Sequence, residues 1–315
     1  MHFIHETVES NKSKIQFKNL CAKYGIRGVP EYKYGDSINF PVIVKPVDRA
    51  GSIGINVAYN QEEFERFYKI AYDLSPSKNV IIEDFIDDGT KVDLYYYVKG
   101  GNIALLGTSD TIMCNGKSGA PILQKAWTFP SRYKIRKMLH GIGLKNGYVT
   151  MSAFYRNDRF YFFEAGFRLS GELSYNYYDY ISGINYIDTL LDYSLGLPNS
   201  DIYEDCYQLN KCTKSIILNY FGIDGIVKKI QTPSNSSNES QKVIGNIYIK
   251  EGDSIHNETN VFKKIAMYTI LSNDNMLEDI IRYINSNLHI IDNKGQELIY
   301  ERVDEKSLNF LQMPK

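Results

Sequence analysis

The stretch FPVIVKPVDRAGSIGI, residues 40–55, decides how the fold is interpreted. An apolar run ends at Lys45, a turn rich in glycine follows, and a second apolar run, INVAY, begins at residue 55. The loop therefore joins a strand to a strand, whereas the glycine loops of dinucleotide-binding proteins and P-loop NTPases lead from a strand into a helix. We expect a β-hairpin whose amide groups can approach an anion without side-chain obstruction, at Gly51, Ser52 and Gly54.

Lys45 adds a charge to this hairpin. Alternation along the strand places it on the same face as Ile43, at the end of a nearly all-apolar run. An ammonium without a partner is costly there, so the pattern predicts an anion beside it. On this stretch alone a lysine that snorkels to water beside an ordinary hairpin is the favoured interpretation. The order of the motifs that follow reverses that preference.

Composition excludes several classes of protein. The 315 residues include 36 basic and 37 acidic side chains, so the charge indicates neither a nucleic-acid partner nor an anionic membrane. Four cysteines without CxxC spacing and five dispersed histidines predict neither a zinc site nor a disulfide framework. The sequence shows no signal peptide and no apolar run near the ~18 residues of a membrane span. We expect a cytoplasmic protein with reduced thiols.

Periodicity and capping predict the elements around the hairpin. Residues 12–24 fit a helix that stops at Gly25. Asn60 and Glu63 form a capping box for the helix after the hairpin, and residues 79–86 form a third strand. Further along, two hairpins (92–107 and 148–164) alternate with single helices, at 131–141 and at about 184–195. This mixture predicts an α+β fold and not a doubly wound sheet.

The last third is expected to be a separate small β-rich unit. Its predicted elements are three strands, a helix and a final hairpin, at 224–230, 242–250, 262–272, 276–288 and around 293–295. The polar stretch 234–240 is expected to be a flexible loop within this unit.

Three stretches in this order resemble the motifs of ATP-grasp ligases. VIVKPVDRAGSIGI (42–55) is similar to the family's phosphate-binding lysine and glycine-rich hairpin, VIIEDFIDDG (80–89) to its adenine hinge, and GYVTMSAFYRNDRFYFFEAGFRLSGE (147–172) to its metal and phosphate hairpin. The resemblance implies an ATP-grasp fold, in which two α+β subdomains grip ATP, followed by a small C-terminal domain.

The resemblance also implies a domain organisation. Residues 1–29 hold a helix that links to a front lobe which this chain lacks, 30–86 form the small lid subdomain, 87–200 the large subdomain and 201–315 a closing domain. A partner chain or a second copy of this chain is expected to supply the missing lobe.

For ATP, the resemblance implies two groups of residues. Lys45, Gly51, Ser52 and Gly54 are expected to hold the phosphates, together with Lys12 as a second lysine. Glu83, Asp84 and Ile86 are expected to hold the adenine at the hinge. The place two residues after the hinge glycine, where family members often carry an acid for the ribose, holds Lys91 here.

The third motif implies the metal and catalytic residues. Glu164, expected on the face of Phe160 and Phe162, is the predicted Mg²⁺ ligand. Pairing of the hairpin places Met151 or Ser152 opposite Glu164, so neither register supplies a second acid. The family's asparagine is replaced by Gly166, as in the E-x-G-x-R variant of the motif.

Two further residues of this motif carry the expected chemistry. Arg168 is expected to stabilise the transferred phosphoryl group. Glu172 is expected to act as a base or to bind the acceptor, although a structural acid at a helix start is an equally good interpretation.

The implied activity is ATP-dependent ligation of a small carboxylate to an amine or a similar nucleophile. It proceeds through an acyl phosphate and releases ADP and phosphate, with ATP and Mg²⁺ required. Two alternatives stay open: a nucleotide-binding or assembly module without catalysis, and an enzyme that activates bicarbonate as carboxyphosphate.

Overall fold

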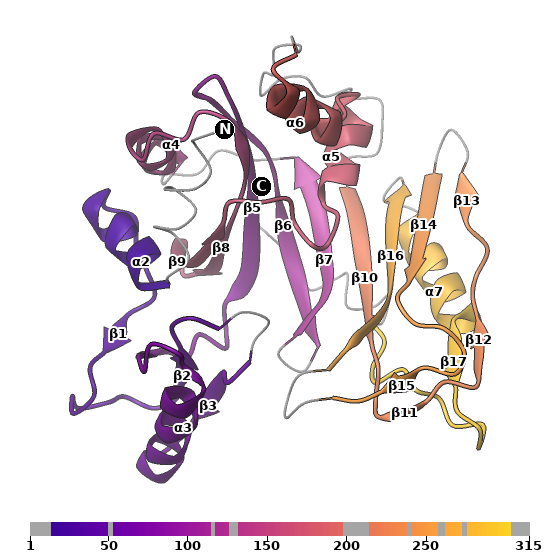
Figure 1. Cartoon of the computed structure of the whole chain (residues 1–315), viewed down its shortest axis with the longest axis horizontal. Helices are drawn as coiled ribbons and strands as arrows, with labels where there is room; N and C mark the ends of the chain where they lie inside the picture. The colour runs from indigo at the N-terminus through magenta and orange to yellow at the C-terminus, as the bar shows by residue number, and fades with distance from the viewer. Residues whose placement is uncertain are drawn as a thin grey trace.

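The fold consists of antiparallel sheets with helices packed on them (Figure 1). It was obtained as a computed structural model, which describes residues 14–49, 53–114, 117–125, 132–197, 214–237, 241–257, 262–272 and 276–303. The named strand pairs within these ranges are antiparallel, which confirms the α+β class expected from the sequence. No helix within these ranges is long and apolar enough to cross a membrane.

A small sheet carries the hairpin. Its strands lie in the order β1 (Glu31–Tyr32), β4 (Val80–Asp84), β2 (Val42–Pro46) and β3 (Asn56–Ala58), and α3 (Gln61–Leu74) packs on one face. Asn60 caps α3 by accepting a hydrogen bond from the Glu63 amide, and the Glu63 carboxylate accepts one from the Tyr59 amide. The predicted cap is therefore confirmed, with the return bond one residue earlier than in a standard capping box.

The large sheet has nine strands. In spatial order they are β13 (Ser236–Ser237), β14 (Gln241–Ile247), β16 (Lys264–Ser272), β10 (Lys214–Phe221), β7 (Lys117–Lys125), β6 (Asn102–Cys114), β5 (Thr90–Lys99), β8 (Gly147–Arg156) and β9 (Arg159–Gly166). Two short strand pairs lie beside it: β11 (Gly225–Ile226) with β15 (Ser254–Ile255), and β12 (Lys229–Gln231) with β17 (His289–Ile291). The long run of pairing connects the middle of the chain to its last third.

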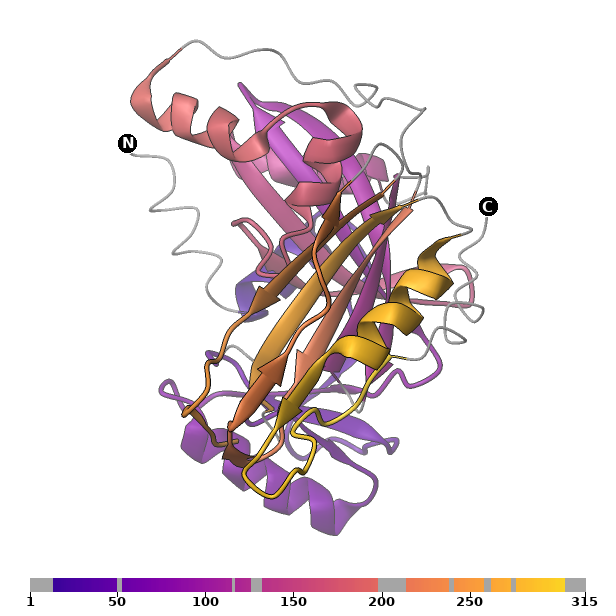
Figure 2. The same cartoon turned by 90° about the vertical axis from the view of Figure 1, so that its right-hand side faces the viewer.

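Helices cover the two faces of this sheet unequally (Figures 1 and 2). On one face lie α2 (Lys14–Lys23), α4 (Arg132–Gly141) and α7 (Leu277–Asn287), each with an apolar side against the strands. On the other face α5 (Tyr175–Ser182) and α6 (Tyr186–Leu195) pack over a core rich in tyrosine. Along β5, Tyr97 and Tyr95 belong to this core, and Asp93 and Lys91 continue the same face beyond it. We call this second face the site face.

Four β-bulges interrupt the alternation of the large sheet, and two of them bear on the candidate site. Between β8 and β9, Ser152 pairs with Glu164 and Ala153 pairs with Phe162, so Phe163 is an extra residue. The second of these, between β10 and β16, pairs Tyr220 with Ala266 and Phe221 with Lys264, so Ile265 is an extra residue. Each bulge reverses the faces of the residues beyond it relative to an unbroken strand.

Elements that were not expected from the sequence include β7, α5 and β10, together with the two-residue strands β1 and β15. The strand predicted at 224–230 is divided into β11 and β12, and part of the loop expected at 234–240 forms β13. The last third was expected to be a separate unit, but β10 pairs with β7 and continues the large sheet. Hydrogen bonding of the β7 edge explains this, because an unpaired edge strand leaves a row of amide and carbonyl groups without partners.

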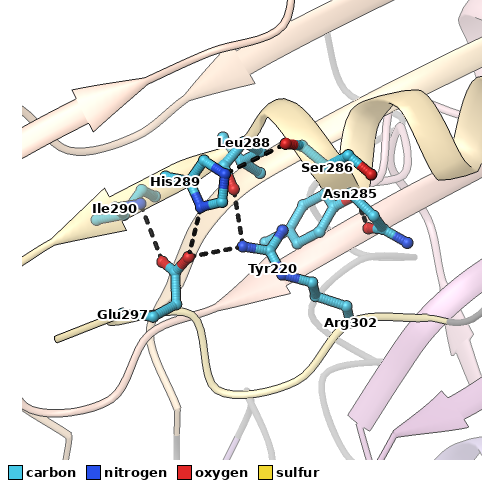
Figure 3. A network of polar contacts seen from close by, with 8 residues as sticks. All are labelled: Tyr220, Asn285, Ser286, Leu288, His289, Ile290, Glu297 and Arg302. Carbon is cyan, nitrogen blue, oxygen red and sulfur yellow. Dashed lines mark hydrogen bonds and ion pairs between the residues drawn. The ribbon is translucent and has the colours of Figure 1, made fainter.

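A network of polar contacts fixes the end of the described chain against α7 and β17 (Figure 3). The Glu297 carboxylate accepts hydrogen bonds from the Ile290 amide at 3.0 Å and from Arg302 Nη2 at 2.9 Å, and its other near neighbour is His289 Nδ1 at 3.0 Å. Arg302 also donates to the Leu288 carbonyl at 2.7 Å and lies over the Tyr220 ring. Arg302 therefore connects three segments of the last third.

We predict that Arg302→Ala lowers the free energy of unfolding by about 2 kcal/mol, because it removes two hydrogen bonds that involve a charged group. Urea denaturation followed by circular dichroism measures this. The control is Arg282→Ala, which breaks an exposed pair with Asp279 on α7 and should change the value by less than about 0.5 kcal/mol. Equal effects of the two substitutions would contradict a stabilising role for the network.

Candidate functional site

Lys45 lies in a buried cluster of charges on the small sheet. Its ammonium donates to Oε2 of Glu83, which is on the neighbouring strand β4 and is 2% exposed. Lys18, from α2, forms ion pairs with the other oxygen of Glu83 and with Glu31. Lys45 and Glu83 lie on the face of the small sheet opposite to α3. The anion that the sequence predicted beside Lys45 is thus a carboxylate of the chain itself.

This pairing changes the expected role of the hinge acids. The Glu83 side chain was expected to contact adenine, but both of its oxygens interact with lysines. The Asp84 carboxylate accepts a hydrogen bond from the Tyr32 hydroxyl at 2.7 Å, and the Asp84 amide donates to the Pro30 carbonyl. Ile86 is buried and packs close to Gly89. Any contact of these residues with adenine stays a prediction.

Packing and backbone conformation both require a glycine at position 54. Its φ of +73° favours glycine, and a Cβ there would lie 2.8 Å from Leu74 Cδ1 and 3.2 Å from the Pro46 ring. Gly54 therefore lets the hairpin pack against the end of α3. Gly51, Ser52 and Lys12, the other predicted phosphate ligands, lie outside the described residues.

Lys14 is a site residue that the sequence analysis missed. Its ammonium donates to the carbonyls of Arg49 at 2.6 Å and Val47 at 3.3 Å, at the start of the glycine turn. Burial lowers the pKa of Lys14, while the carboxylate of Glu164 favours its charged form. Lys14 therefore lies between the small sheet and β9. Its spacing from Lys18, four residues along one helix, was the available indication that the two share a face.

Glu164 lies on a different face of its strand from the one predicted. The sequence placed it with Phe160 and Phe162, which are buried under α2 and α4. The bulge at Phe163 instead places Glu164 opposite Ser152, on the site face, where its side chain is exposed. Of the two registers expected for this hairpin, the structure has the one with Ser152.

Asp93 supplies a second carboxylate beside Ser152. It lies on β5 directly across from Ser152, and the Ser152 hydroxyl donates a hydrogen bond to Asp93 Oδ1. Asp93 is buried, with 4% of its surface exposed. The signal in the sequence was an acid within the otherwise apolar strand VDLYYYV, which needs a partner for the same reason as Lys45.

Lys91 neutralises this acidic cluster. Its ammonium forms an ion pair with Asp93 at 2.8 Å. Burial disfavours the charged ammonium, but the carboxylates of Asp93, Glu172 and Glu164 together raise the pKa of Lys91 above its usual value. Lys91 therefore does not take the place of the expected ribose acid and instead belongs to the cluster on the site face.

Arg168 and Glu172 follow β9. Arg168 is exposed and donates to the neighbouring Leu169 carbonyl at 3.0 Å. Glu172 is half-buried, and its Oε1 accepts a hydrogen bond of 3.4 Å from Asn219 on β10. Its carboxylate also acts electrostatically on Lys91 and on Lys264 of β16. Glu172 thus brings the predicted site into contact with strands of the last third.

The acids on the site face that the structure describes fit Mg²⁺ when further ligands complete its coordination. Among the described residues, no three side chains of the types His, Cys, Asp or Glu are grouped so as to hold a metal. Glu164 is exposed, whereas Asp93 is engaged by Lys91 and Ser152. Mg²⁺ commonly takes one or two carboxylates together with phosphate oxygens and waters, and Glu164 suits that arrangement.

Sequence comparisons agree with these features. Residues 30–105 match the family model described as the D-ala D-ala ligase C-terminus. The carbamoyl phosphate synthase large chain of Mycobacterium tuberculosis is 25% identical over 163 residues, which is 45% of this chain and 14% of that protein. The mitochondrial acetyl-CoA carboxylase of Saccharomyces cerevisiae is 27% identical over 172 residues, 51% of this chain and 7% of that protein. The chain therefore spans a small part of these curated relatives.

Solved structures extend the likeness to most of the chain. The biotin carboxylase domain of the Hydrogenobacter thermophilus 2-oxoglutarate carboxylase, solved with MgADP and bicarbonate, has a TM-score of 0.72 at 18% identity and covers 90% of this chain and 67% of that one. This chain has the ATP-grasp fold. The L-amino acid ligase of Bacillus licheniformis shares the ATP-grasp fold, with a TM-score of 0.72 at 16% identity over 91% of this chain and 73% of that one.

We predict that Glu83→Gln lowers the free energy of unfolding by about 3 kcal/mol, since it leaves the ammonium groups of Lys45 and Lys18 buried without their shared carboxylate. Thermal and urea unfolding measure the loss. The matched control is Glu65→Gln on α3, an exposed acid that contacts Tyr34 and Gln61. A loss no larger than that of the control would show that the buried pairs do not hold the small sheet to α2.

Proposed function

We propose that this ATP-grasp protein activates a small carboxylate with ATP as an acyl phosphate and transfers it to an amine or a similar nucleophile. The observation that supports the proposal is that lysines and acids from the small sheet, α2 and the large sheet lie next to one another. Lys14 lies between the glycine turn and Glu164, and Lys91 lies among Asp93, Glu164 and Glu172. Lysines for phosphates and acids for a metal and a substrate are therefore arranged along one path, as a phosphoryl transfer requires.

Each residue has a proposed role in this chemistry. Lys45 and Lys14 neutralise the phosphates of ATP, with Lys12 and the amides of Gly51, Ser52 and Gly54 in the turn. The backbone around Glu83, Asp84 and Ile86 receives the adenine, while the Glu83 carboxylate holds Lys45 in place. This pairing reduces the cost of keeping a lysine buried before ATP binds.

Glu164 is the proposed protein ligand of Mg²⁺, with the remaining ligands from the ATP phosphates and from water. When bound, the metal supplies positive charge at the phosphate oxygens. Arg168 neutralises the transferred group with its planar guanidinium, and Glu172 accepts a proton from the attacking amine.

We propose residues 29, 86 and 200 as the limits of the subdomains, with the last third joined to the large sheet.

We predict that MgADP raises the thermal midpoint of the protein, and that Lys14→Gln weakens the effect by removing one phosphate-binding charge. A ligand at a hundred times its dissociation constant adds about 2.7 kcal/mol of stability. Lys14 is preferable to the buried Lys45 for this test because it is half-buried, and its partners within the described part of the chain are two carbonyls. Lys69→Gln, at an exposed position of α3, is the control.

Release of ADP from MgATP in the presence of pooled carboxylates and amines tests catalysis. Glu164→Gln should abolish the release. Binding of MgADP without any release would favour the non-catalytic module, and release that depends on bicarbonate alone would favour carboxyphosphate formation. Absence of any effect of MgADP on the midpoint would contradict the proposed function.

A further inference from the structure

The bulge between β10 and β16 has a consequence for Lys264. Had the pairing continued unbroken beyond Tyr220, Phe221 would lie opposite Ile265 and Lys264 would lie on the face that packs against α7. The structure instead pairs Phe221 with Lys264, and Ile265 is fully buried in the α7 core. The bulge thus places Lys264 on the site face, with Asn219 and Met267. Bulges commonly re-aim a side chain next to a functional site.

The charged group near Lys264 is the carboxylate of Glu172. The Glu172 carboxylate accepts a hydrogen bond from Asn219, which is 3% exposed and lies two residues before Phe221 on β10. Burial lowers the pKa of Lys264, and Glu172 is the charged group that opposes this effect. Glu172 therefore lies near Lys264 without forming a salt bridge with it among the described residues.

The Glu172 carboxylate and the Lys264 ammonium carry opposite charges but do not form a salt bridge with each other. A carboxylate alone would be repelled by Glu172, and an ammonium alone would be repelled by Lys264. A small molecule that carries both groups matches both residues, and its carboxylate would supply the counter-charge that burial of Lys264 requires.

We propose that Glu172, Asn219 and Lys264 form a subsite for a small zwitterion, an amino acid, with its carboxylate on Lys264 and its ammonium on Glu172. The subsite rests on the proposed function, because it assigns the class of the substrate that shares the site with ATP. Glu172 acts electrostatically on both Lys91 and Lys264, which connects the subsite to the acidic cluster. The strands of the last third therefore contribute directly to substrate selection.

The test measures binding of three matched mixtures to the full chain with MgADP present. The first holds the twenty common L-amino acids, the second their N-acetyl derivatives, which lack the ammonium, and the third their amides, which lack the carboxylate. Shifts of the thermal midpoint and equilibrium dialysis with mass spectrometry report binding without requiring turnover. The amino acids alone should bind.

Lys264→Gln is expected to weaken binding of the retained amino acid about tenfold or more, the effect of losing one charge-assisted hydrogen bond. Lys264→Arg should restore most of the affinity. Lys263→Gln changes the exposed neighbouring lysine and should have no effect. Because burial disfavours the Lys264 ammonium, the glutamine variant is expected to fold, and its midpoint without ligand checks this.

Equal binding of the amides, equal binding of the N-acetyl derivatives, no binding of any mixture, or unchanged affinity in Lys264→Gln would each overturn the subsite. These outcomes differ from failure of the proposed function, which is seen as the absence of any response to MgADP. Lys264→Gln should leave the response to MgADP intact.

Discussion

A β-strand places successive side chains on opposite faces, and the candidate site of this protein depends on two places where the large sheet breaks that rule. Unbroken pairing would place Glu164 under α2 and α4, and Lys264 under α7. One extra residue in β9 and one in β16 place these two charges on the site face instead. The apolar face remains free of them, so the helices can pack there without burying an ion.

On the site face of the large sheet, apolar and polar side chains occupy different ends of the strands. At one end of the site face, buried tyrosines of β5 and β8 pack under α5 and α6. Towards the other end, the residues of the same face are Asp93, Lys91, Ser152 and Asn219. The apolar end provides a rigid base, and the polar end presents side chains whose positions are fixed by the hydrogen-bonded strands beneath them.

On the small sheet, Glu83 fixes the position of a charged side chain of the candidate site. One buried carboxylate accepts two lysines from different elements, which joins α2 to β2 and β4 and fixes the position of Lys45. Buried charges are tolerated only when they are paired in this way. The arrangement also sets Lys14, one helical turn before Lys18, beside the glycine turn.

The sequence by itself determined the hairpin, the cap of α3, the α+β class and the order of the three motifs, because these depend on local propensity and on spacing. It pointed to Lys45 and Glu164 as charged side chains that need a partner, since an ion in an apolar strand requires one. Tertiary structure decided which partner Lys45 has, which face Glu164 occupies, and the joining of the last third to the large sheet. It also decided that Asp93, Lys91 and Lys264 share one face. A bulge or a strand pairing between distant segments changes these relations through backbone hydrogen bonds. Every residue has the carbonyl for such bonds and every residue but proline has the amide, so these changes leave little trace in the residue types.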